Sequence, residues 1–293
     1  MKQHEIPGRI TLADGHGGLA KIIVTSSAAT AEIYLHGAHV TGFQKNGEPP
    51  IIFLSKKSLF APGKAIRGGV PICFPWFGPR AGDVAHGFAR ITEWELSKTA
   101  ATPDGHVTVH LRLPEIPARP ETKALSTEFI VTVSDRLTME LRVTNTSGQE
   151  ILFESCLHTY FAVGDISQAS ITGLHGVQYV DKVENAAHKL EASDAIRISS
   201  EVDRVYLNTT GPVEIHDAKL RRKISVTKTG SASTVVWNPW IDKAKAMADF
   251  GAEEYHNMVC IESGNVADNK ITLAPGKTAS LKATLASQPQ AVD

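Results

Sequence analysis

The chemically richest part of the chain is the stretch 61–90, APGKAIRGGVPICFPWFGPRAGDVAHGFAR. It combines basic side chains, paired glycines, a His-Gly step and aromatic residues beside prolines. Guanidinium groups on a glycine-bent backbone suit an anionic ligand, and aromatic rings stack on the apolar face of a pyranose. A phosphorylated sugar has both features, so we expect this stretch to contact such a ligand. The alternative is a Pro/Gly-rich loop that only turns a sheet corner.

Two ionisable residues lie inside apolar, strand-like segments: His158 in ILFESCLHTYFAV and Glu262 in YHNMVCIESGNV. Burying a carboxylate without a partner is costly. At the end of a buried strand, beside a glycine bend, Glu262 can face a cleft, where desolvation raises its pKa and suits it to act as a general base. The alternatives are structural: Glu262 bonded to Asn265 or a backbone amide, and His158 as a satisfied core histidine.

A third candidate is His86 in AHGFAR, where the following glycine permits a tight turn. It is either a ligand contact or a loop histidine that caps a backbone carbonyl. His86, His158 and Glu262 together could also form a metal triad, which would suit a metal-dependent sugar-phosphate isomerase or lyase. A carbohydrate-binding protein without turnover is the other alternative, with Glu262 and His158 as structural residues.

The cysteines give little support for metal or redox chemistry. Cys73, Cys156 and Cys260 each lie in an apolar run, which is typical of buried, reduced thiols in a cytoplasmic protein. No CxxC spacing occurs, so neither a zinc ribbon nor a redox motif is indicated. His36 and His39 are three apart in a strand-turn segment and need not converge, so we expect no metal site there.

Alternation with a period of two indicates the elements that position these residues. Apolar and polar residues alternate over 107–113, 137–144, 224–227 and 281–285, as in strands with one buried face. Turn pairs separate such segments: Asn46-Gly47, Asp104-Gly105, Ser147-Gly148 and Pro275-Gly276. Only 242–250, rich in Ala and Lys, suggests a short helix or turn. The sequence therefore predicts an all-β protein, a large sandwich of antiparallel sheets.

The length and the net charge of the chain limit the number of domains and the classes of partner. The chain has 293 residues, no low-complexity linker and no fixed repeat, so we expect one domain over 1–293. The net charge of −1 offers no global field for nucleic acid or a membrane. The N-terminal segment lacks an apolar signal region. We expect a cytoplasmic monomer that binds a small molecule.

Six blocks of the sequence then resemble a known family. APGKAIRGGVPICFPWFGP, HGFAR, ESCLHTYF, DRVY, WNPW and VCIESGNV occur in this order between about residue 60 and residue 266. They are similar to the blocks of the glucose-6-phosphate 1-epimerase family, the hexose-6-phosphate mutarotase branch of the aldose 1-epimerases. The resemblance implies a galactose-mutarotase-like β-supersandwich. It also implies interconversion of the α and β anomers of a hexose 6-phosphate, most simply D-glucose 6-phosphate, without metal or organic cofactor.

The resemblance also assigns roles to individual residues. It implies that His158 is the general acid and Glu262 the general base. The implied substrate contacts are arginines for phosphate and sugar, a carboxylate for a sugar hydroxyl and a histidine for the ring end: Arg67, Arg90, Asp203 and His86. One departure is Ala85, which stands where some family members have Gln before HGFAR. The phosphate contacts could therefore involve Lys64 or Arg80 instead.

Overall fold

The computed structural model describes residues 2–290, and antiparallel strands make up most of their regular secondary structure. The described residues contain two α-helices, α1 (Pro120–Ala124) and α2 (Trp240–Ala246). Short 3₁₀ turns complete the helical content: Lys2–His4, His16–Gly18, Ala89–Ile91, Ile166–Gln168, Glu254–Asn257 and Ala267–Asn269. None of the helices in this part of the chain is long and apolar enough to cross a membrane. The all-β prediction is confirmed.

The largest sheet has nine strands and contains every segment predicted from alternation. Its order is β16 (Ala195–Ile196), β13 (Ala169–Thr172), β18 (Val213–Asp217), β19 (Arg222–Thr229), β23 (Thr278–Pro289), β9 (Leu137–Asn145), β8 (Leu125–Val133), β7 (Val107–Arg112) and β6 (Glu95–Ala101). In β8 and β9 every second side chain is buried and the others are partly exposed. One face of this sheet therefore packs into the core, as the period of two requires.

The second large sheet has eight strands. Its order is β15 (Ala187–Leu190), β14 (Gln178–Asp181), β17 (Val202–Tyr206), β20 (Ser233–Asn238), β21 (Met258–Asn265), β11 (Ser155–Leu157) and β5 (Ile72–Cys73), and β12 (Tyr160–Ala162) also pairs with β21. In β20 and β21 every residue is buried, so both faces of these strands are covered.

Two smaller sheets complete the fold. One has four strands: β1 (Ile10–Asp14), β2 (Ala20–Thr25), β3 (Ala29–Tyr34) and β4 (His39–Lys45). The other pairs β10 (Ile151–Phe153) with β22 (Ile271–Leu273).

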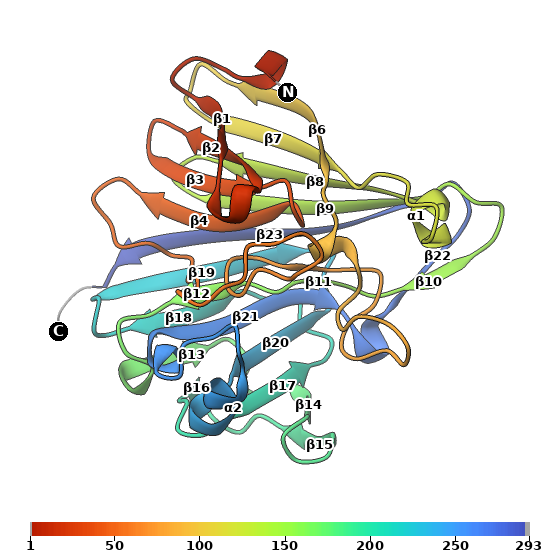
Figure 1. Cartoon of the computed structure of the whole chain (residues 1–293). Coiled ribbons are helices and arrows are strands. Elements are labelled where there is room, and N and C mark those ends of the chain that lie inside the picture. The colour runs from red at the N-terminus through yellow and green to blue at the C-terminus, as the bar shows by residue number, and fades with distance from the viewer. Residues whose placement is uncertain (1, 291–293) are drawn as a thin grey trace.

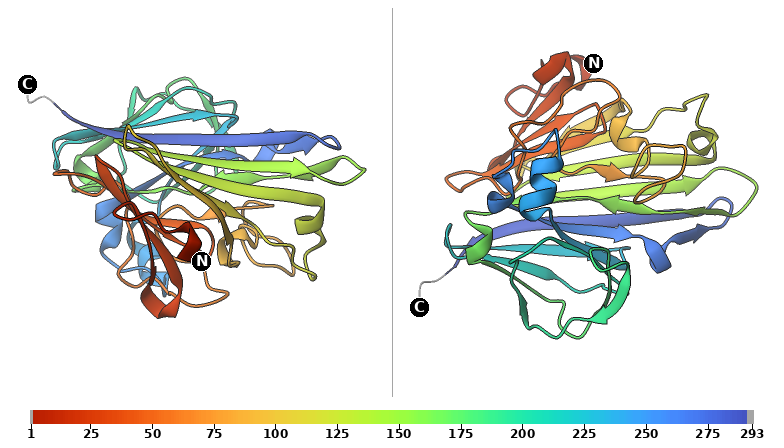
Figure 2. Two further views of the ribbon diagram at one scale, coloured as in Figure 1. Left: turned by 90° about the horizontal axis from the view of Figure 1, so that it is seen from above. Right: turned by 60° about the horizontal axis from the view of Figure 1, so that its bottom comes forward.

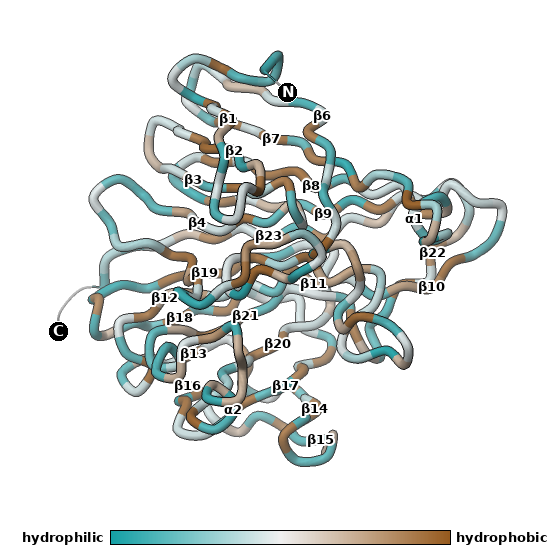
Figure 3. The backbone as a smooth tube through the Cα atoms, viewed as in Figure 1, coloured by the Kyte–Doolittle hydropathy of each residue, from teal (hydrophilic) through white to brown (hydrophobic). Residues whose placement is uncertain are grey.

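The nine-stranded sheet packs against both the four-stranded and the eight-stranded sheet, and Figures 1 and 2 show this arrangement in three views. β3 of the four-stranded sheet lies against β8, and β21 of the eight-stranded sheet lies against β23. One apolar core joins all three sheets, with Ile33, Phe129 and Ile261 among its members. Figure 3 shows the corresponding apolar segments along the strands. Because Ile261 faces this core, its neighbours Cys260 and Glu262 on β21 face the opposite side.

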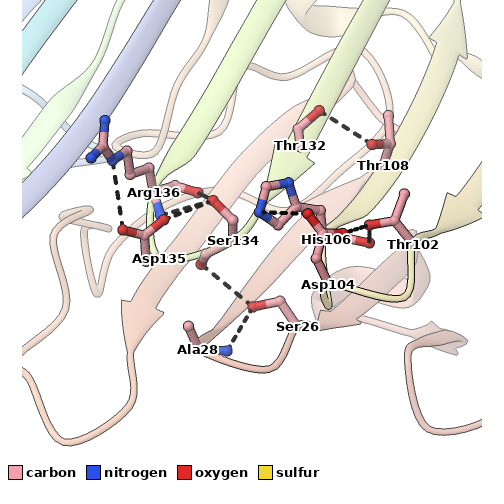
Figure 4. Close-up of polar contacts among 10 residues, drawn as sticks. All are labelled: Ser26, Ala28, Thr102, Asp104, His106, Thr108, Thr132, Ser134, Asp135 and Arg136. Atoms are coloured by element: carbon pink, nitrogen blue, oxygen red, sulfur yellow. Dashed lines mark hydrogen bonds and ion pairs between the residues drawn. The ribbon is translucent and has the colours of Figure 1, made fainter.

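Polar turn residues join neighbouring hairpins at one end of the sheets (Figure 4). Ser26 Oγ, after β2, donates to the carbonyl of Ser134, between β8 and β9, at 3.4 Å. In the β6–β7 turn, Asp104 accepts from Thr102 Oγ1 and lies 3.7 Å from His106 Nε2. The predicted Asp-Gly turn is thus present, and it closes the hairpin between β6 and β7, of which β7 was predicted from alternation.

The predicted helix is shifted relative to its expected position. It was expected within 242–250, but α2 begins at Trp240, whose N–H donates to Asn238 Oδ1 at 2.8 Å, and ends at Ala246 because Met247 is extended. Asn238 Oδ1 thus accepts from the first N–H of the helix, whereas the N-cap residue, Pro239, provides no side-chain cap.

Candidate active site

The site is built on one face of the eight-stranded sheet by strand register. Two adjacent rows of side chains cross the strands β17, β20, β21 and the β11–β12 segment. The first row is Asp203, Trp237, Cys260 and Tyr160. The second row is Val205, Val235 and Glu262, with His158 opposite Glu262 in the two-residue break between β11 and β12. Residues two apart on each strand share this face, which is why widely separated blocks of sequence meet here.

A cavity of about 320 Å³ opens over this face and contains most of the predicted site. Its lining includes five of the six predicted residues: Arg67, His86, His158, Asp203 and Glu262. The sixth, Arg90, is not among the lining residues. The structure therefore brings together the proposed acid, the proposed base and three of the four proposed substrate contacts.

His158 and Glu262 are in direct contact at the floor of this cavity. His158 Nε2 lies 3.2 Å from Glu262 Oε1, and the two side chains are 10% and 1% exposed. The other carboxylate oxygen, Oε2, accepts a hydrogen bond from the Cys156 thiol at 3.4 Å. The imidazole stacks on the Tyr160 ring, with centroids 4.8 Å apart and planes at 11°. The alternative bond to Asn265 is absent, since that side chain bonds the backbone at Gly230 and Ala232.

Burial favours the neutral form of both members of the pair. It raises the pKa of Glu262 well above its ordinary value, with the nearby Asp203 carboxylate adding to the effect. It lowers the pKa of His158 well below its ordinary value, and the cationic side chains nearby act in the same direction. The contact between the two favours the ion pair instead. Burial and the contact thus act in opposite directions on the protonation of this pair.

His86 faces His158 across the cavity, with ring centroids 5.8 Å apart. It adopts φ of +64°, and the next residue, Gly87, has φ of +73°. A Cβ on Gly87 would lie 1.9 Å from the Phe74 carbonyl oxygen, so only glycine fits this turn. His86 Nδ1 accepts from the Gly78 N–H at 3.3 Å, which leaves the ring proton on Nε2. Burial lowers the pKa of His86 to about 3, so it is a neutral hydrogen-bond donor.

Arg67 is held firmly at the cavity wall. Its Nε donates to Asp249 Oδ2 at 3.2 Å and its NH1 donates to the Tyr160 hydroxyl at 3.1 Å. Two histidines fix the loop that carries it: His36 Nε2 bonds the carbonyl of Lys64 at 2.7 Å, and His39 Nε2 bonds that of Gly68 at 2.8 Å. These histidines thus have a structural role in shaping the wall.

Arg90 lies outside the cavity lining. Its NH2 donates to the carbonyl of Ala85 at 2.7 Å, and its Nε is buried without a hydrogen-bond partner among the described residues. Residue 85 therefore contacts Arg90 through its backbone carbonyl, although Ala85 lacks the side-chain amide of a Gln. Of the reserve cations, Arg80 lies over the Trp76 ring at 4.4 Å, and Lys64 is exposed; neither lines the cavity.

Sequence reasoning missed two lysines that do line the cavity, Lys182 and Lys243. Lys182 Nζ lies 4.0 Å from Asp203 Oδ1 and 4.6 Å from the centroid of the Phe77 ring. Lys243 Nζ pairs with Glu201 at 2.7 Å. The sequence gives little indication of either residue, because Lys182 only follows the end of a strand and Lys243 lies in a short helix. The pairing of β14 with β17 places Lys182 at the site, because its backbone N–H donates to the carbonyl of Asp203 on β17.

The described residues also contain one group that could accept a metal ion. It consists of His158, Cys260 and Glu262, whose ligand atoms all lie within 4.8 Å of one another. The trio considered from the sequence had His86 in place of Cys260. The difference follows from register, since Cys260 is two residues from Glu262 on β21 and shares its face.

Comparisons with known proteins agree with this fold and these blocks. The sequence model of the aldose 1-epimerase family matches residues 21–286. A protein from Cenchrus ciliaris, provisionally named glucose-6-phosphate 1-epimerase, is 37% identical over 284 residues, covering 89% of this chain and 82% of the relative. An Escherichia coli K12 protein with the same provisional name is 34% identical over 252 residues, covering 85% and 84%.

A solved structure provides the corresponding evidence on the fold. The crystal structure of a protein from Salmonella typhimurium, provisionally described as a mutarotase, superposes with a TM-score of 0.89 at 30% identity and covers 98% of this chain and 96% of its own. The sheets described above are thus those of the galactose-mutarotase-like supersandwich. The chain belongs to the aldose 1-epimerase family.

Proposed function

We propose that the protein interconverts the α and β anomers of a hexose 6-phosphate, with D-glucose 6-phosphate as its substrate. The observation that carries this proposal is the buried His158–Glu262 pair, 3.2 Å apart, on the floor of a cavity with cationic side chains on its walls. Two further facts support it: the family to which the chain belongs and the provisional names of its relatives.

The reaction needs two proton transfers. The C1 hydroxyl loses a proton to Glu262 while the ring oxygen gains one from His158, and the C1–O5 bond breaks to leave the open-chain aldehyde. Rotation about C1–C2 then presents the other carbonyl face. The C5 hydroxyl attacks that face, giving its proton to His158, and Glu262 returns a proton to the new C1 hydroxyl. Each transfer can contribute about 10²–10⁴-fold.

The burial of His158 and Glu262 suits these proton transfers. Ring opening converts a carboxylate and an imidazolium into a carboxylic acid and a neutral imidazole, so the net charge of the pair does not change. The 3.2 Å contact stabilises the state before opening, and burial stabilises the state after it. The two states are therefore drawn closer in free energy, which suits a reaction that must proceed in both directions.

The remaining polar groups would hold the sugar and its phosphate. Asp203, whose pKa is raised by burial, would accept from a sugar hydroxyl, and the Nε2–H of His86 would donate to the ring end. We infer that Arg67 and Lys182 bind the phosphate, because both line the cavity and each keeps N–H groups free for an anion. Arg90 would act from outside the cavity lining, through its charge and its bond to Ala85.

Exchange NMR tests the proposal directly. Two-dimensional exchange spectra of glucose 6-phosphate at anomeric equilibrium should show cross-peaks between the α and β anomeric signals that grow with protein concentration. A carbohydrate-binding protein without turnover would broaden or shift these signals without adding exchange above the spontaneous rate. That outcome would reject the enzyme and retain only the sugar site.

The same assay addresses the cofactor. Because the proton transfers need neither redox change nor a carbanion, we propose that no metal or organic cofactor takes part. Activity should survive dialysis against EDTA. Loss of activity that one specific metal restores would instead favour a metal-dependent sugar-phosphate isomerase. We also infer a single catalytic domain acting as a cytoplasmic monomer; its three buried free thiols suit a reducing compartment.

A further inference from the structure

Cys260 is a buried thiol at the site that the proposed reaction does not use. It occupies the first row of the sheet face, paired in register with Tyr160 on one side and Trp237 on the other. Its sulfur lies within 4.8 Å of both a ring nitrogen of His158 and a carboxylate oxygen of Glu262. One nitrogen, one sulfur and one oxygen ligand thus converge at the cavity floor.

This mixture of ligand atoms selects for particular cations. Zn²⁺ binds imidazole nitrogen, thiolate sulfur and carboxylate oxygen in tetrahedral sites, whereas Mg²⁺ and Ca²⁺ require oxygen ligands. Sites with three protein ligands leave the fourth position to water or to another small ligand. Here His158 and Glu262 line the cavity, so the fourth position would open into the space of the sugar.

The geometry is nearly that of such a site. Two ligands bound to one tetrahedral zinc at about 2.0–2.1 Å lie roughly 3.3 Å apart, and Nε2 of His158 is 3.2 Å from Oε1 of Glu262. The Cys260 sulfur must approach by on the order of 1 Å to bind at the usual distance of about 2.3 Å. Cys260 is fully buried, so the ion would enter from the cavity side.

We propose that His158, Cys260 and Glu262 form an inhibitory site for Zn²⁺. The ion forms bonds to Nε2, Sγ and a carboxylate oxygen. Two protons leave to water as these bonds form: the Cys260 S–H proton and the proton that the His158–Glu262 pair carries on Nε2 or on the carboxyl group. No electron transfer is involved. A bound ion occupies both groups that move protons, so it competes with the hexose phosphate. The inhibition rests on the proposed function, whereas the binding does not.

Cobalt(II) provides a binding test that is independent of activity. Co²⁺ replaces Zn²⁺ in such sites, and a thiolate ligand gives it an intense near-ultraviolet charge-transfer band. The titration uses the whole protein, a phosphine reductant and a phosphate-free buffer. We expect a saturable band at one equivalent in wild type and in Cys73→Ala, and no band in Cys260→Ala. Cys73 is a matched control, because it is equally buried but lies outside the trio.

The outcomes separate clearly. No band in wild type, or a band of full size in Cys260→Ala, overturns the site. Circular dichroism checks that Cys260→Ala is folded. If it is not, Cys260→Ser takes its place; its hydroxyl keeps the volume of the side chain but cannot give the thiolate band.

Inhibition is then measured with buffered Zn²⁺ in the exchange assay, each variant being compared with its own uninhibited rate. The half-inhibitory concentration should rise at least about tenfold in Cys260→Ala, since even groups that only support a ligand commonly contribute that much to metal affinity. It should rise with hexose phosphate concentration in wild type, and Mg²⁺ should not inhibit. Equal inhibition of both proteins would overturn the role of Cys260. A thiolate band in a protein that shows no anomer exchange would reject the proposed function and leave the zinc site standing.

Discussion

Two histidine–glutamate contacts, one in each of the two large sheets, have similar lengths. In the nine-stranded sheet, His110 Nδ1 lies 2.9 Å from Glu128 Oε1, and the side chains are 21% and 32% exposed. In the eight-stranded sheet, His158 and Glu262 are 3.2 Å apart and 10% and 1% exposed. The contact is no shorter where we propose catalysis, so the contact alone does not make a site.

The surroundings of the two glutamates differ. Glu128 also pairs with Arg142 at 3.2 Å, on the partly exposed face of the sheet, where water and a guanidinium stabilise its charge. Glu262 has a thiol and an imidazole as its direct partners and lies beneath a cavity. Burial on a strand covered on both faces is therefore what makes the second pair suited to moving protons.

The largest expected effect is that of Glu262→Gln. The amide keeps the shape of the side chain but cannot take up the C1 proton, so anomer exchange should fall by at least about 10²-fold. Glu128→Gln, the matched change in the other sheet, should leave exchange within about twofold. Exchange NMR on glucose 6-phosphate measures both variants, with circular dichroism as the check on folding. Retention of more than about a tenth of wild-type exchange in Glu262→Gln would remove its role as base.

His158→Ala should be comparably damaging, because the ring oxygen loses its proton donor. The expected loss is again about 10²-fold or more. The control is His110→Ala, which removes the other histidine of the comparison and should change exchange little. If the two variants lost activity equally, catalysis would not depend on the buried pair.

The pH profile should show two limbs, and burial sets their direction. Adding a proton to the neutral pair makes it cationic, which burial opposes, so the acid limb moves below the ordinary histidine pKa of 6.5. Removing a proton makes it anionic, so the alkaline limb moves above the ordinary carboxyl pKa of 4.5. We expect kcat/KM to be level between the limbs and to fall outside them. The measurement is kcat/KM against pH for wild type, and a profile with one limb would contradict the coupled pair.

Phosphate recognition should depend on the cations at the cavity. A charge-assisted hydrogen bond is worth about 1.5–3 kcal/mol, so Arg67→Ala or Lys182→Ala should lower kcat/KM for glucose 6-phosphate roughly 10- to 150-fold. Arg90→Ala should have a smaller effect, since Arg90 lies outside the cavity lining. Free glucose should be a poor substrate for wild type, and its interconversion should change little in Lys182→Ala. Equal losses on both substrates would mean that these residues support the sugar ring or the fold.

The two sheets also differ in how far the sequence predicts them. Alternation over 137–144 and 281–285 correctly indicates β9 and β23, because each strand has one buried and one partly exposed face. The same rule is silent for β20 and β21, where every residue is buried and no alternation remains. The strands that carry the candidate site are thus the ones that a period of two cannot detect. For β20 and β21, the prediction depended on the resemblance of short sequence blocks to those of the family.

Individual site residues were predictable to different degrees. Glu262 and His158 stood out because an ionisable residue in an apolar run needs an explanation. Lys182 did not, since only pairing of β14 with β17 brings the end of one strand beside Asp203. The sequence also could not reveal that Arg67 is partly committed to Asp249 and Tyr160, because those contacts join residues far apart in the chain.

The smallest effect concerns Cys156, whose thiol donates to Glu262 Oε2 at 3.4 Å. This hydrogen bond stabilises the carboxylate, so its loss in Cys156→Ala should raise the pKa of Glu262 further and move the alkaline limb to higher pH. A net hydrogen bond is worth about 0.5–1.5 kcal/mol, toward the lower end for a weak S–H donor, so the movement of the limb should be small and exchange on the level part of the profile should stay within about twofold of wild type. Cys156→Ser keeps a donor and should return the limb most of the way. Cys73, the register partner of Cys156 on β5, provides the control, because Cys73→Ala alters the same buried cluster without touching Glu262. A shift of the limb in Cys156→Ala but not in Cys73→Ala would assign the effect to the hydrogen bond, whereas equal rate losses with unmoved limbs in both would assign it to packing.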